Sequence, residues 1–350
     1  MFWLVAAALI AATFGILTLA LIALFAGMMG LALFAAAASA LSLAFCIALS
    51  FGARAYVRRA EAQWPAQGRF ISAGKARVHV REAGKAGAPR VLLIHGANAN
   101  LRELWTPFAD TLAEDFHVLA MDRPGLGYSS RPKRARTLKV QAELAAAVLR
   151  ERGGEPAVIV GHSYGASVAL RLAIEAPQLV RGLVLIAPAC HKFPGKPIWW
   201  ARLAATPLLG RLFCGLLIPN LGPLLARTNI GRNFYPGEAP KDYYDANGVG
   251  LAFRPSAFRA SAEDVCRANA EFAAQTPRYP EIFAPTIIIT AEKDRVLSPK
   301  RHARALAATL ASAELVIAPD TGHMPHQLRP DLGIAAIRRV NAMASVSEPS

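Results

Sequence analysis

The chain opens on an unbroken apolar stretch, since none of its first 53 residues carries a charged side chain. As one straight helix this stretch would be about 80 Å long, against a hydrocarbon core of about 30 Å. Glycines at residues 27–30 divide it into two spans, 2–26 and 31–51, each long enough to cross a bilayer. The pattern therefore predicts a transmembrane helical hairpin over residues 1–53, followed by a basic juxtamembrane linker over residues 54–67.

A cleaved signal peptide is the alternative to the hairpin. The stretch lacks a basic first segment and is longer than a signal peptide, which argues against that alternative. Arg54, Arg58 and Arg59 directly follow the second span, whereas the turn at 27–30 carries no cation. By the positive-inside rule both ends of the hairpin, and the domain that follows, are expected in the cytoplasm.

From residue 68 onward the pattern changes to short apolar strands that alternate with helical stretches. The strand signals lie at 90–94, in a segment ending at Met121, and at 157–160, 182–187, 286–290 and 315–318. This alternation is typical of an α/β fold, in which a mostly parallel sheet carries helices on both faces. We expect the core to occupy residues 68–190 and 281–342.

Nearly a hundred residues without a strand signal separate the strands at 182–187 and 286–290, which is too long for a structureless loop. Prolines break this region and arginines would be buried if it formed a third membrane span. The pattern predicts an inserted helical cap over residues 191–280, covering an apolar pocket or dipping into the membrane interface. The interrupting residues are Arg202, Pro207, Arg211, Pro219 and Pro223.

The clearest chemical signal is the run Gly161-His162-Ser163-Tyr164-Gly165, which lies between a β-branched strand and a helix of small residues. A Gly-x-Ser-x-Gly turn at such a junction raises one serine hydroxyl above the edge of the sheet. The strained backbone of that serine leaves no room for a Cβ at either glycine. The context favours Ser163 as a nucleophile over a structural serine in a tight turn.

A serine nucleophile needs a base and a carboxylate that orients the base, in the chain order Ser, Asp or Glu, His. Asp294, in the loop after the strand at 286–290, is the expected acid, with Glu292 as the runner-up. His323, after the strand at 315–318, is the expected base, with His326 as its rival. His191 opens the cap and is either a substrate contact or a surface histidine.

Acyl transfer also needs N–H donors for the oxyanion that develops. The backbone N–H of Tyr164, directly after the serine, is one expected donor. The second is the N–H of Ala97, in the sharp turn that begins His95-Gly96 after the strand at 90–94.

Together these segments resemble the α/β-hydrolase superfamily over residues 68–342. The resemblance includes the loop at 122–129, interpreted as scaffold near the serine turn rather than as a dinucleotide fingerprint, because no helix opens at its glycines. Because Ser163 holds the nucleophile position, the resemblance implies the branch with serine esterases, lipases, C–C bond hydrolases and cofactor-free perhydrolases. It points away from dehalogenases and epoxide hydrolases.

The charge and the cysteine content of the chain indicate which binding partners, disulfides and metals to expect. The net charge of +15 lies entirely after residue 53 and indicates either a basic face toward anionic lipid or a dispersed solvated surface. No nucleic-acid-binding module is recognisable. Cys190, Cys214 and Cys266 are an odd number outside the spans, which is a poor disulfide framework. No Cys-x-x-Cys or His-Glu-x-x-His spacing occurs, so neither metal nor cofactor is implied.

The sequence thus predicts a membrane-anchored serine hydrolase that cleaves carboxylic esters of apolar acyl groups through an acyl-enzyme. C–C bond hydrolysis or perhydrolysis by the same residues is the main alternative. Acyl transfer to an alcohol and a catalytically silent binding protein are weaker ones.

Overall fold

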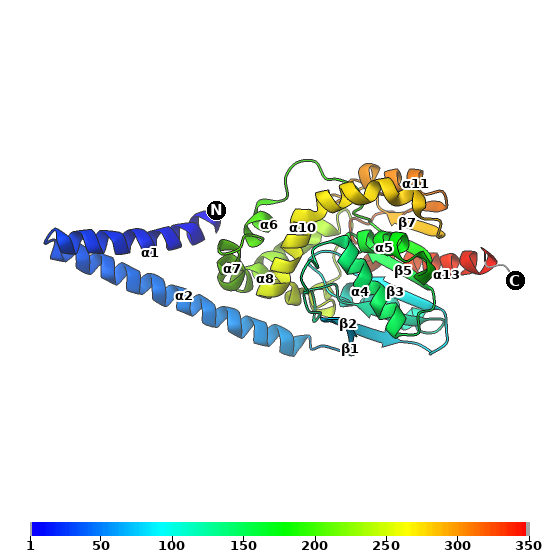
Figure 1. Ribbon diagram of the computed structural model, residues 1–350, viewed down its shortest axis with the longest axis horizontal. Helices are drawn as coiled ribbons and strands as arrows, with labels where there is room; N and C mark the ends of the chain where they lie inside the picture. Colours follow the sequence, from blue (N-terminus) through cyan, green and yellow to red (C-terminus); the bar gives the residue numbers. More distant parts are fainter. Residues whose placement is uncertain (1, 348–350) are drawn as a thin grey trace.

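A computed structural model describes the backbone of residues 2–347, with the side chains of residues 13–22 and 24–345 (Figure 1). At its centre lies a sheet of eight strands in the order β1-β2-β4-β3-β5-β6-β7-β8. The β1–β2 and β2–β4 pairs are antiparallel, and all other pairs are parallel. The strands are β1 (Arg69–Ala73), β2 (Ala76–Ala83), β3 (Arg90–Ile94), β4 (His117–Met121), β5 (Ala157–His162), β6 (Val180–Ile186), β7 (Thr286–Thr290) and β8 (Ala313–Ile317).

Successive side chains of the central strands enter two separate apolar cores, as the two-residue period of a strand requires. On β3, Leu92 and Ile94 pack into the core under α4 and α5, whereas Val91 and Leu93 pack into the core under α3 and α13. Both faces of the sheet are thereby covered, which explains why the parallel strands are apolar throughout. The covering helices are α3 (Arg102–Leu112), α4 (Leu138–Glu151), α5 (Tyr164–Glu175), α11 (Ala305–Thr309) and α13 (Pro330–Ser347), with the short α12 (Pro325–Leu328) before α13.

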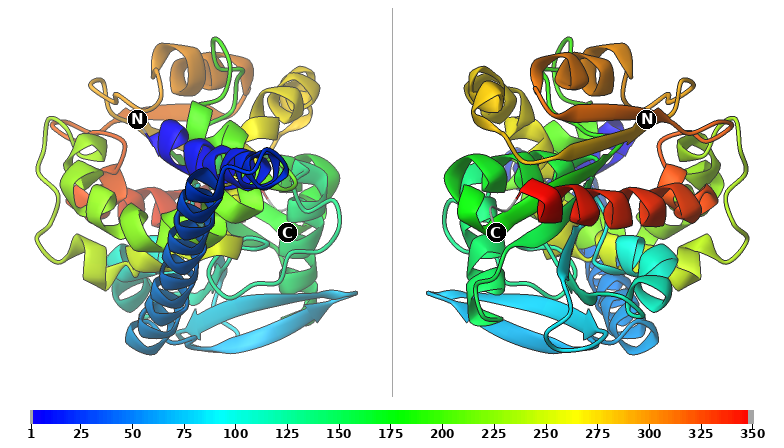
Figure 2. Two further views of the ribbon diagram at one scale, coloured as in Figure 1. Left: turned by 90° about the vertical axis from the view of Figure 1, so that its left-hand side faces the viewer. Right: turned by 90° about the vertical axis from the view of Figure 1, so that its right-hand side faces the viewer.

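Within the described residues, the chain between β6 and β7 is helical and contains no strand, as the missing strand signals predict. This cap lies over the end of the sheet where the parallel strands terminate (Figures 1 and 2). It contains α6 (Trp199–Ala204), α7 (Leu209–Leu212), α8 (Ile218–Asn229), α9 (Tyr243–Ala246) and α10 (Pro255–Gln275). Shorter helical turns join them: η2 (Phe213–Leu217), η3 (Ile230–Asn233), η4 (Val249–Phe253) and η5 (Thr276–Glu281).

The N-terminal region forms two antiparallel helices that project from the cap end of the domain, α1 (Phe2–Phe25) and α2 (Met29–Gln63) (Figure 1). The turn between them lies at the glycine segment that the sequence predicts as a break. By length and apolarity α2 is able to cross a membrane, and so is the composite stretch Leu209–Asn233. That second stretch includes α7, η2, α8 and η3, and it packs against α2 and the rest of the cap.

The predicted linker at residues 54–67 is corrected by the structure, because α2 continues without interruption to Gln63. Its last turns are amphipathic and dock on the cap. The Tyr56 hydroxyl donates to the Gly250 carbonyl (2.8 Å), and the Trp64 indole N–H donates to the Asp245 carbonyl (2.7 Å). Trp64 is buried with Tyr244 in a small apolar cluster. The arginines that suggested a linker are carried by the outer face of a packed helix.

Candidate active site

Ser163 occupies a sharp turn between β5 and α5. Its backbone has φ 50° and ψ −117°, a left-handed conformation that is strained for a residue with a side chain. A Cβ on Gly161 would lie 2.6 Å from the Ala166 Cα, and one on Gly165 would lie 2.1 Å from the Ile94 carbonyl oxygen. Both glycines are therefore required by close backbone approach, as the sequence pattern predicts.

The structure brings Ser163, His323 and Asp294 into one hydrogen-bonded chain, here called the triad cluster. His323 Nε2 lies 3.1 Å from Ser163 Oγ, and His323 Nδ1 lies 2.8 Å from Asp294 Oδ2. The other Asp294 oxygen accepts the N–H groups of Val296 (2.7 Å) and Leu297 (2.9 Å). Burial raises the pKa of Asp294, but the His323 ring and these two N–H groups outweigh it and hold the pKa below its usual value.

The competing residues lie elsewhere. Glu292 is exposed and pairs with Arg304 on the surface. His326 is fully buried, and neither of its ring nitrogens has a hydrogen-bond partner among the described residues. His191 lies beside Cys190 and His302 and is not among the residues that line the cavity described below.

The loop after β3 passes directly beneath Ser163. A Cβ on Gly96 would lie 3.3 Å from the Ser163 Cβ, so the loop and the serine turn are in contact. Ala97 follows Gly96 and lines the same cavity as Ser163. Tyr164 is the first residue of α5, where backbone N–H groups have no acceptor within the helix. The residues of both expected donors therefore lie next to the serine turn, Ala97 in the loop that contacts it and Tyr164 directly after it.

A second carboxylate and two histidines form what we call the inner cluster: Glu103, His162 and His326. Glu103 Oε2 accepts the Gly96 N–H (2.8 Å) and lies 3.1 Å from His162 Nδ1. The other His162 nitrogen, Nε2, lies 3.0 Å from the His323 carbonyl oxygen. Glu103 and His162 therefore connect the loop after β3, the serine turn and the loop that carries His323.

The inner cluster contains a buried ion pair. Burial raises the pKa of Glu103, but the charge and hydrogen bond of His162 outweigh it and lower the pKa to about 2. Burial lowers the pKa of His162, and Glu103 outweighs that effect so that the pKa is raised. Burial, assisted by the charge of His162, lowers the pKa of His326 well below its usual value and keeps that ring neutral.

Arg123 ties the same loop to the cap. This buried guanidinium donates to the Gly96 carbonyl (2.9 Å), pairs with Asp264 of α10 (2.5 Å) and lies over the Tyr164 ring, 4.3 Å from its centroid. Since charge removed from water is costly unless paired, the Arg123–Asp264 contact fixes α10 above the serine turn. The cap is therefore held on the core by this buried ion pair as well as by apolar packing.

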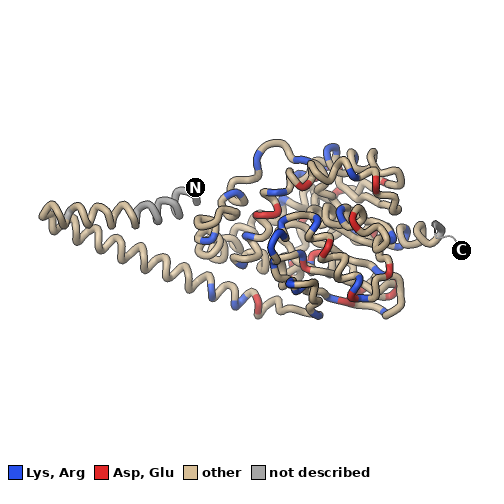
Figure 3. The backbone as a smooth tube through the Cα atoms, in the orientation of Figure 1, with Lys and Arg blue, Asp and Glu red and all other residues tan. Residues whose placement is uncertain are grey.

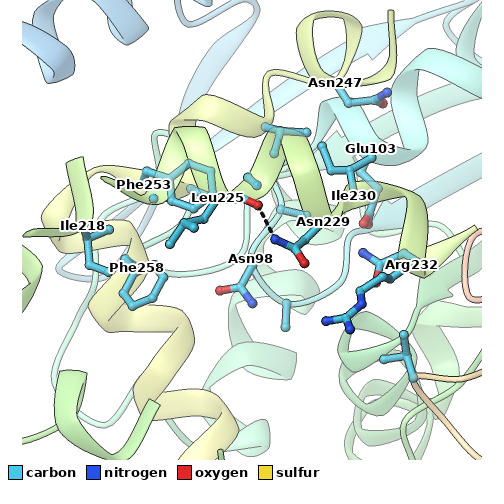
Figure 4. Close-up of a pocket in the computed structure, with 18 of the residues that line it drawn as sticks. Asn98, Glu103, Ile218, Leu225, Asn229, Ile230, Arg232, Asn247, Phe253 and Phe258 are labelled. Carbon is cyan, nitrogen blue, oxygen red and sulfur yellow. Dashed lines mark hydrogen bonds between the residues drawn. The ribbon is translucent and has the colours of Figure 1, made fainter. Parts of the chain in front are cut away.

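The triad cluster opens into a cavity of about 650 Å³ between the cap and the sheet (Figure 4). Most of its wall is apolar and comes from α6, η2, α8, η4 and α10. Asn98, Asn229 and Arg232 add polar groups at one side (Figure 4). The apolar lining includes Trp199, Trp200, Phe213, Leu217, Ile218, Leu221, Leu225, Phe253 and Phe258.

Two groups of side chains have the spacing of metal ligands, although neither corresponds to a metal-binding motif in the sequence. The ligand atoms of Glu103, His162 and His326 lie within 4.8 Å of one another, as do those of Cys190, His191 and His302. Some of these donors already make contacts within the protein: Glu103 accepts a backbone N–H, and His302 Nδ1 accepts those of Cys190 and His191. The two ring nitrogens of His326 have no hydrogen-bond partner among the described residues.

Sequence reasoning did not identify Glu103, His162 or Arg123 as parts of the site. Glu103 lies in the first turn of α3, where an acidic residue is ordinarily explained by the helix dipole. Its contact with His162 joins positions 59 residues apart. The one sequence feature that could have pointed to a role of Glu103 in the site is its closeness in the chain to the His95-Gly96 turn.

Known proteins share both sequence and fold with this chain. Over 112 residues it is 42% identical to the dihydrolipoyllysine-residue acetyltransferase component of the acetoin cleaving system of Cupriavidus necator, covering 32% of this chain and 30% of that protein. Over 113 residues it is 39% identical to lipase LipV of Mycobacterium tuberculosis, covering 32% and 42%. The chain thus matches less than half the length of either relative.

Among solved structures, the fold is similar to that of 2-hydroxy-6-oxo-6-phenylhexa-2,4-dienoate hydrolase from a Rhodococcus species. The TM-score is 0.64 at 23% identity, over 78% of this chain and 97% of that one. A sequence model of the alpha/beta hydrolase family matches residues 91–337, which include β3, the serine turn, the cap and the His323 loop. The strand order, the serine turn and this match together show that the chain belongs to the alpha/beta hydrolase family.

Proposed function

We propose that this protein is a serine hydrolase that cleaves carboxylic esters of apolar acyl groups. The observation that carries the proposal is the continuous Asp294–His323–Ser163 hydrogen-bond chain, which ends in a hydroxyl facing a largely apolar cavity. The similarity to a lipase supports the ester as substrate. The structural similarity to a dienoate hydrolase supports the fold alone.

In the first half-reaction, Ser163 Oγ attacks the ester carbonyl carbon while His323 Nε2 takes the hydroxyl proton. The N–H groups of Ala97 and Tyr164 stabilise the resulting oxyanion, a contribution typically worth about 10²–10³ in rate per donor. His323 then gives its proton to the departing alkoxide. An alcohol leaves, and the acyl group remains on Ser163.

In the second half-reaction, water takes the place of the alcohol. His323 removes a proton from the water as it attacks the acyl carbonyl, and then returns that proton to Ser163 Oγ as the carboxylic acid leaves. Asp294 accepts the Nδ1–H of His323 throughout, which fixes the tautomer and stabilises the imidazolium. Its lowered pKa keeps it ionised near neutral pH.

The hairpin is part of the proposal. We expect α1 and α2 to cross the bilayer, with Arg54, Arg58 and Arg59 holding the hydrolase domain in the cytoplasm. The apolarity and length of α2 support this arrangement. Protease added to intact cells should leave the domain uncut, and cleavage without opening the membrane would contradict the orientation.

The decisive test of activity is labelling of the purified full-length protein with a fluorophosphonate, followed by an ester panel of increasing acyl length. We expect label on Ser163 and faster turnover of longer acyl chains. A vinylogous diketone assayed in parallel separates C–C bond hydrolysis from ester hydrolysis. Labelling that persists in Ser163→Ala would contradict the proposal.

A further inference from the structure

The end of the cap that faces the hairpin exposes apolar side chains. They come from α7, α8 and the residues just before α6 and α7, at the end of the domain from which α2 projects (Figures 1 and 2). A concentration of exposed apolar side chains on one part of a protein surface marks an interaction site. The residues of this surface, here called the cap face, are Ile198, Leu208, Leu209, Leu212, Leu224 and Leu225.

The docking of α2 fixes the height of the cap face relative to a bilayer. Along α2, Leu49 makes the first hydrogen bond to the cap among the described residues, since its carbonyl accepts from the Asn220 side chain of α8 (3.0 Å). The 20 residues from 29 to 48 rise about 30 Å, which equals the thickness of the hydrocarbon core. If α2 crosses the membrane, α8 therefore begins where the hydrocarbon ends.

The contacts farther along α2 make this placement rigid. Glu61 pairs with Arg254 (2.8 Å), and the Tyr56 and Trp64 side chains donate to cap carbonyls. The cap is thus attached to the membrane helix at both ends of the docked segment. These contacts hold the cap beside the end of the apolar part of α2.

The charged side chains in the part of the cap that carries the cap face are all basic. Residues 176–237 contain no Asp or Glu, whereas residues 191–237 contain six exposed cations. Among the described residues, only Arg227 of these six pairs with a carboxylate, Asp245 (3.6 Å). Figure 3 shows basic positions at this end of the domain. A segment that carries exposed apolar side chains and cations but no carboxylate matches the surface of an anionic bilayer.

The cavity reaches this surface. Leu225 lines the cavity and is also about half exposed on the cap face. Leu221, Ile218 and Leu217 line the same cavity, and so does Ser163. An acyl chain that enters beside Leu225 would therefore lie against apolar side chains in the cavity that holds the serine.

From these observations we infer that the cap face lies on the anionic surface of the bilayer and that the cavity takes its substrate, a long-chain ester dissolved in the lipid, directly from the membrane. This inference rests on the proposed function for its chemistry and on the hairpin for its placement. It assigns a partner, the bilayer, to the cap itself and not only to the hairpin.

Full-length protein in nanodiscs of phosphatidylcholine with phosphatidylglycerol tests the inference. Leu208, 70% exposed on the cap face, is changed to Glu, and Phe283, 81% exposed just before β7 at the opposite end of the sheet, receives the same change as a control. Leu208→Glu should slow hydrolysis of bilayer-borne methylumbelliferyl oleate about tenfold or more, while soluble p-nitrophenyl butyrate stays within about twofold. Phe283→Glu should alter neither rate.

The charge contribution is tested with Arg202→Gln and Arg211→Gln together. This variant should abolish the advantage of phosphatidylglycerol nanodiscs over phosphatidylcholine ones in oleate hydrolysis. Unchanged lipid dependence, or equal oleate rates for Leu208→Glu and the wild type, would overturn the inference.

A measurement without catalysis separates the two proposals. A bimane label on Leu208→Cys, with Cys46 and Cys266 replaced, should be quenched by nitroxide-bearing lipid, whereas a label on Phe283→Cys should not. Quenching in a protein that hydrolyses no ester would leave the cap contact standing and reject the proposed function. Equal quenching at both positions would reject the cap contact.

Discussion

Two clusters of one carboxylate with histidine lie side by side beneath the cap, and they differ in where their hydrogen-bond chains end. In the triad cluster the chain runs from Asp294 through His323 to a hydroxyl that faces the cavity. In the inner cluster it runs from Glu103 through His162 to the carbonyl of His323. The same residue types therefore supply a reactive hydroxyl in one place and a structural brace in the other.

The clusters also differ in how charge is held. The inner cluster favours an ion pair, since Glu103 has a pKa of about 2 and the pKa of His162 is raised. In the proposed mechanism His323 instead gains and loses a proton in every half-reaction. A fixed charge pair suits a brace between loops, whereas a base must titrate.

The largest expected effects lie in the triad cluster. Ser163→Ala and His323→Ala should each remove nearly all ester turnover, and the double variant should be scarcely slower than either, because these residues act as a unit. Steady-state kinetics on a soluble ester, with circular dichroism to verify the fold, measures this. Multiplicative losses in the double variant would reject the pairing.

A slightly smaller loss is expected at the carboxylate. Asp294→Asn should lower kcat by roughly 10⁴, because the amide no longer supports the imidazolium and favours the wrong tautomer. Glu292→Gln is the matched control two residues away, and it should have little effect because Glu292 pairs only with Arg304. A reversal of the two results would move the acid to Glu292.

Local sequence predicted the triad cluster better than its surroundings. Ser163 can be identified from the sequence because its strained turn requires glycines at 161 and 165. This requirement involves only five consecutive residues and is therefore visible as a short motif. The sequence favoured Asp294 over Glu292 as the acid, and the folded chain brings Asp294 to His323. The Glu103–His162 contact depends on how α3 packs on the sheet, which no local sequence pattern records.

The end of α2 was misread for a related reason. Arg54, Arg58 and Arg59 led to the prediction of a basic juxtamembrane linker over residues 54–67, yet Tyr56 of α2 and Trp64, directly after it, pack against the cap. The packing role of these side chains depends on the position of the cap, which cannot be predicted from the sequence of α2 alone.

The inner cluster should give an intermediate effect. Glu103→Gln removes the charge that holds His162 and weakens the acceptor of the Gly96 N–H, so we expect kcat to fall about 10- to 100-fold through misplacement of the oxyanion loop. The exposed Glu114→Gln, with the same change of charge, is the control and should leave kcat unchanged. A wild-type rate for Glu103→Gln would show that the brace is dispensable.

The same substitution should reverse a pH dependence of stability. His162 has a raised pKa in the folded protein, so its stabilisation is complete below its ordinary pKa of 6.5 and is lost as pH rises through the raised value. In Glu103→Gln the two largest effects that raise this pKa are gone, and we expect burial to outweigh the His323 carbonyl and Asp294 and to lower the pKa. Stability should then rise with pH near 6.5. Differential thermal unfolding against Glu114→Gln, between about pH 5.5 and 8.5, measures the sign.

The smallest effect is expected at His326, and it separates the clusters most sharply because His326 lies three residues from His323. Its ring is neutral and buried against His162, with centroids 4.4 Å apart, and neither nitrogen is hydrogen-bonded within the described residues. His326→Leu keeps most of the volume and removes two unsatisfied polar atoms, so stability should stay the same or rise by about 1 kcal/mol.

Turnover of His326→Leu should stay within about threefold of the wild type, since no proton passes through this ring. Chemical unfolding and steady-state kinetics on His326→Leu beside His323→Leu test both points, and equal loss of turnover in the two variants would make His326 part of the reacting chain.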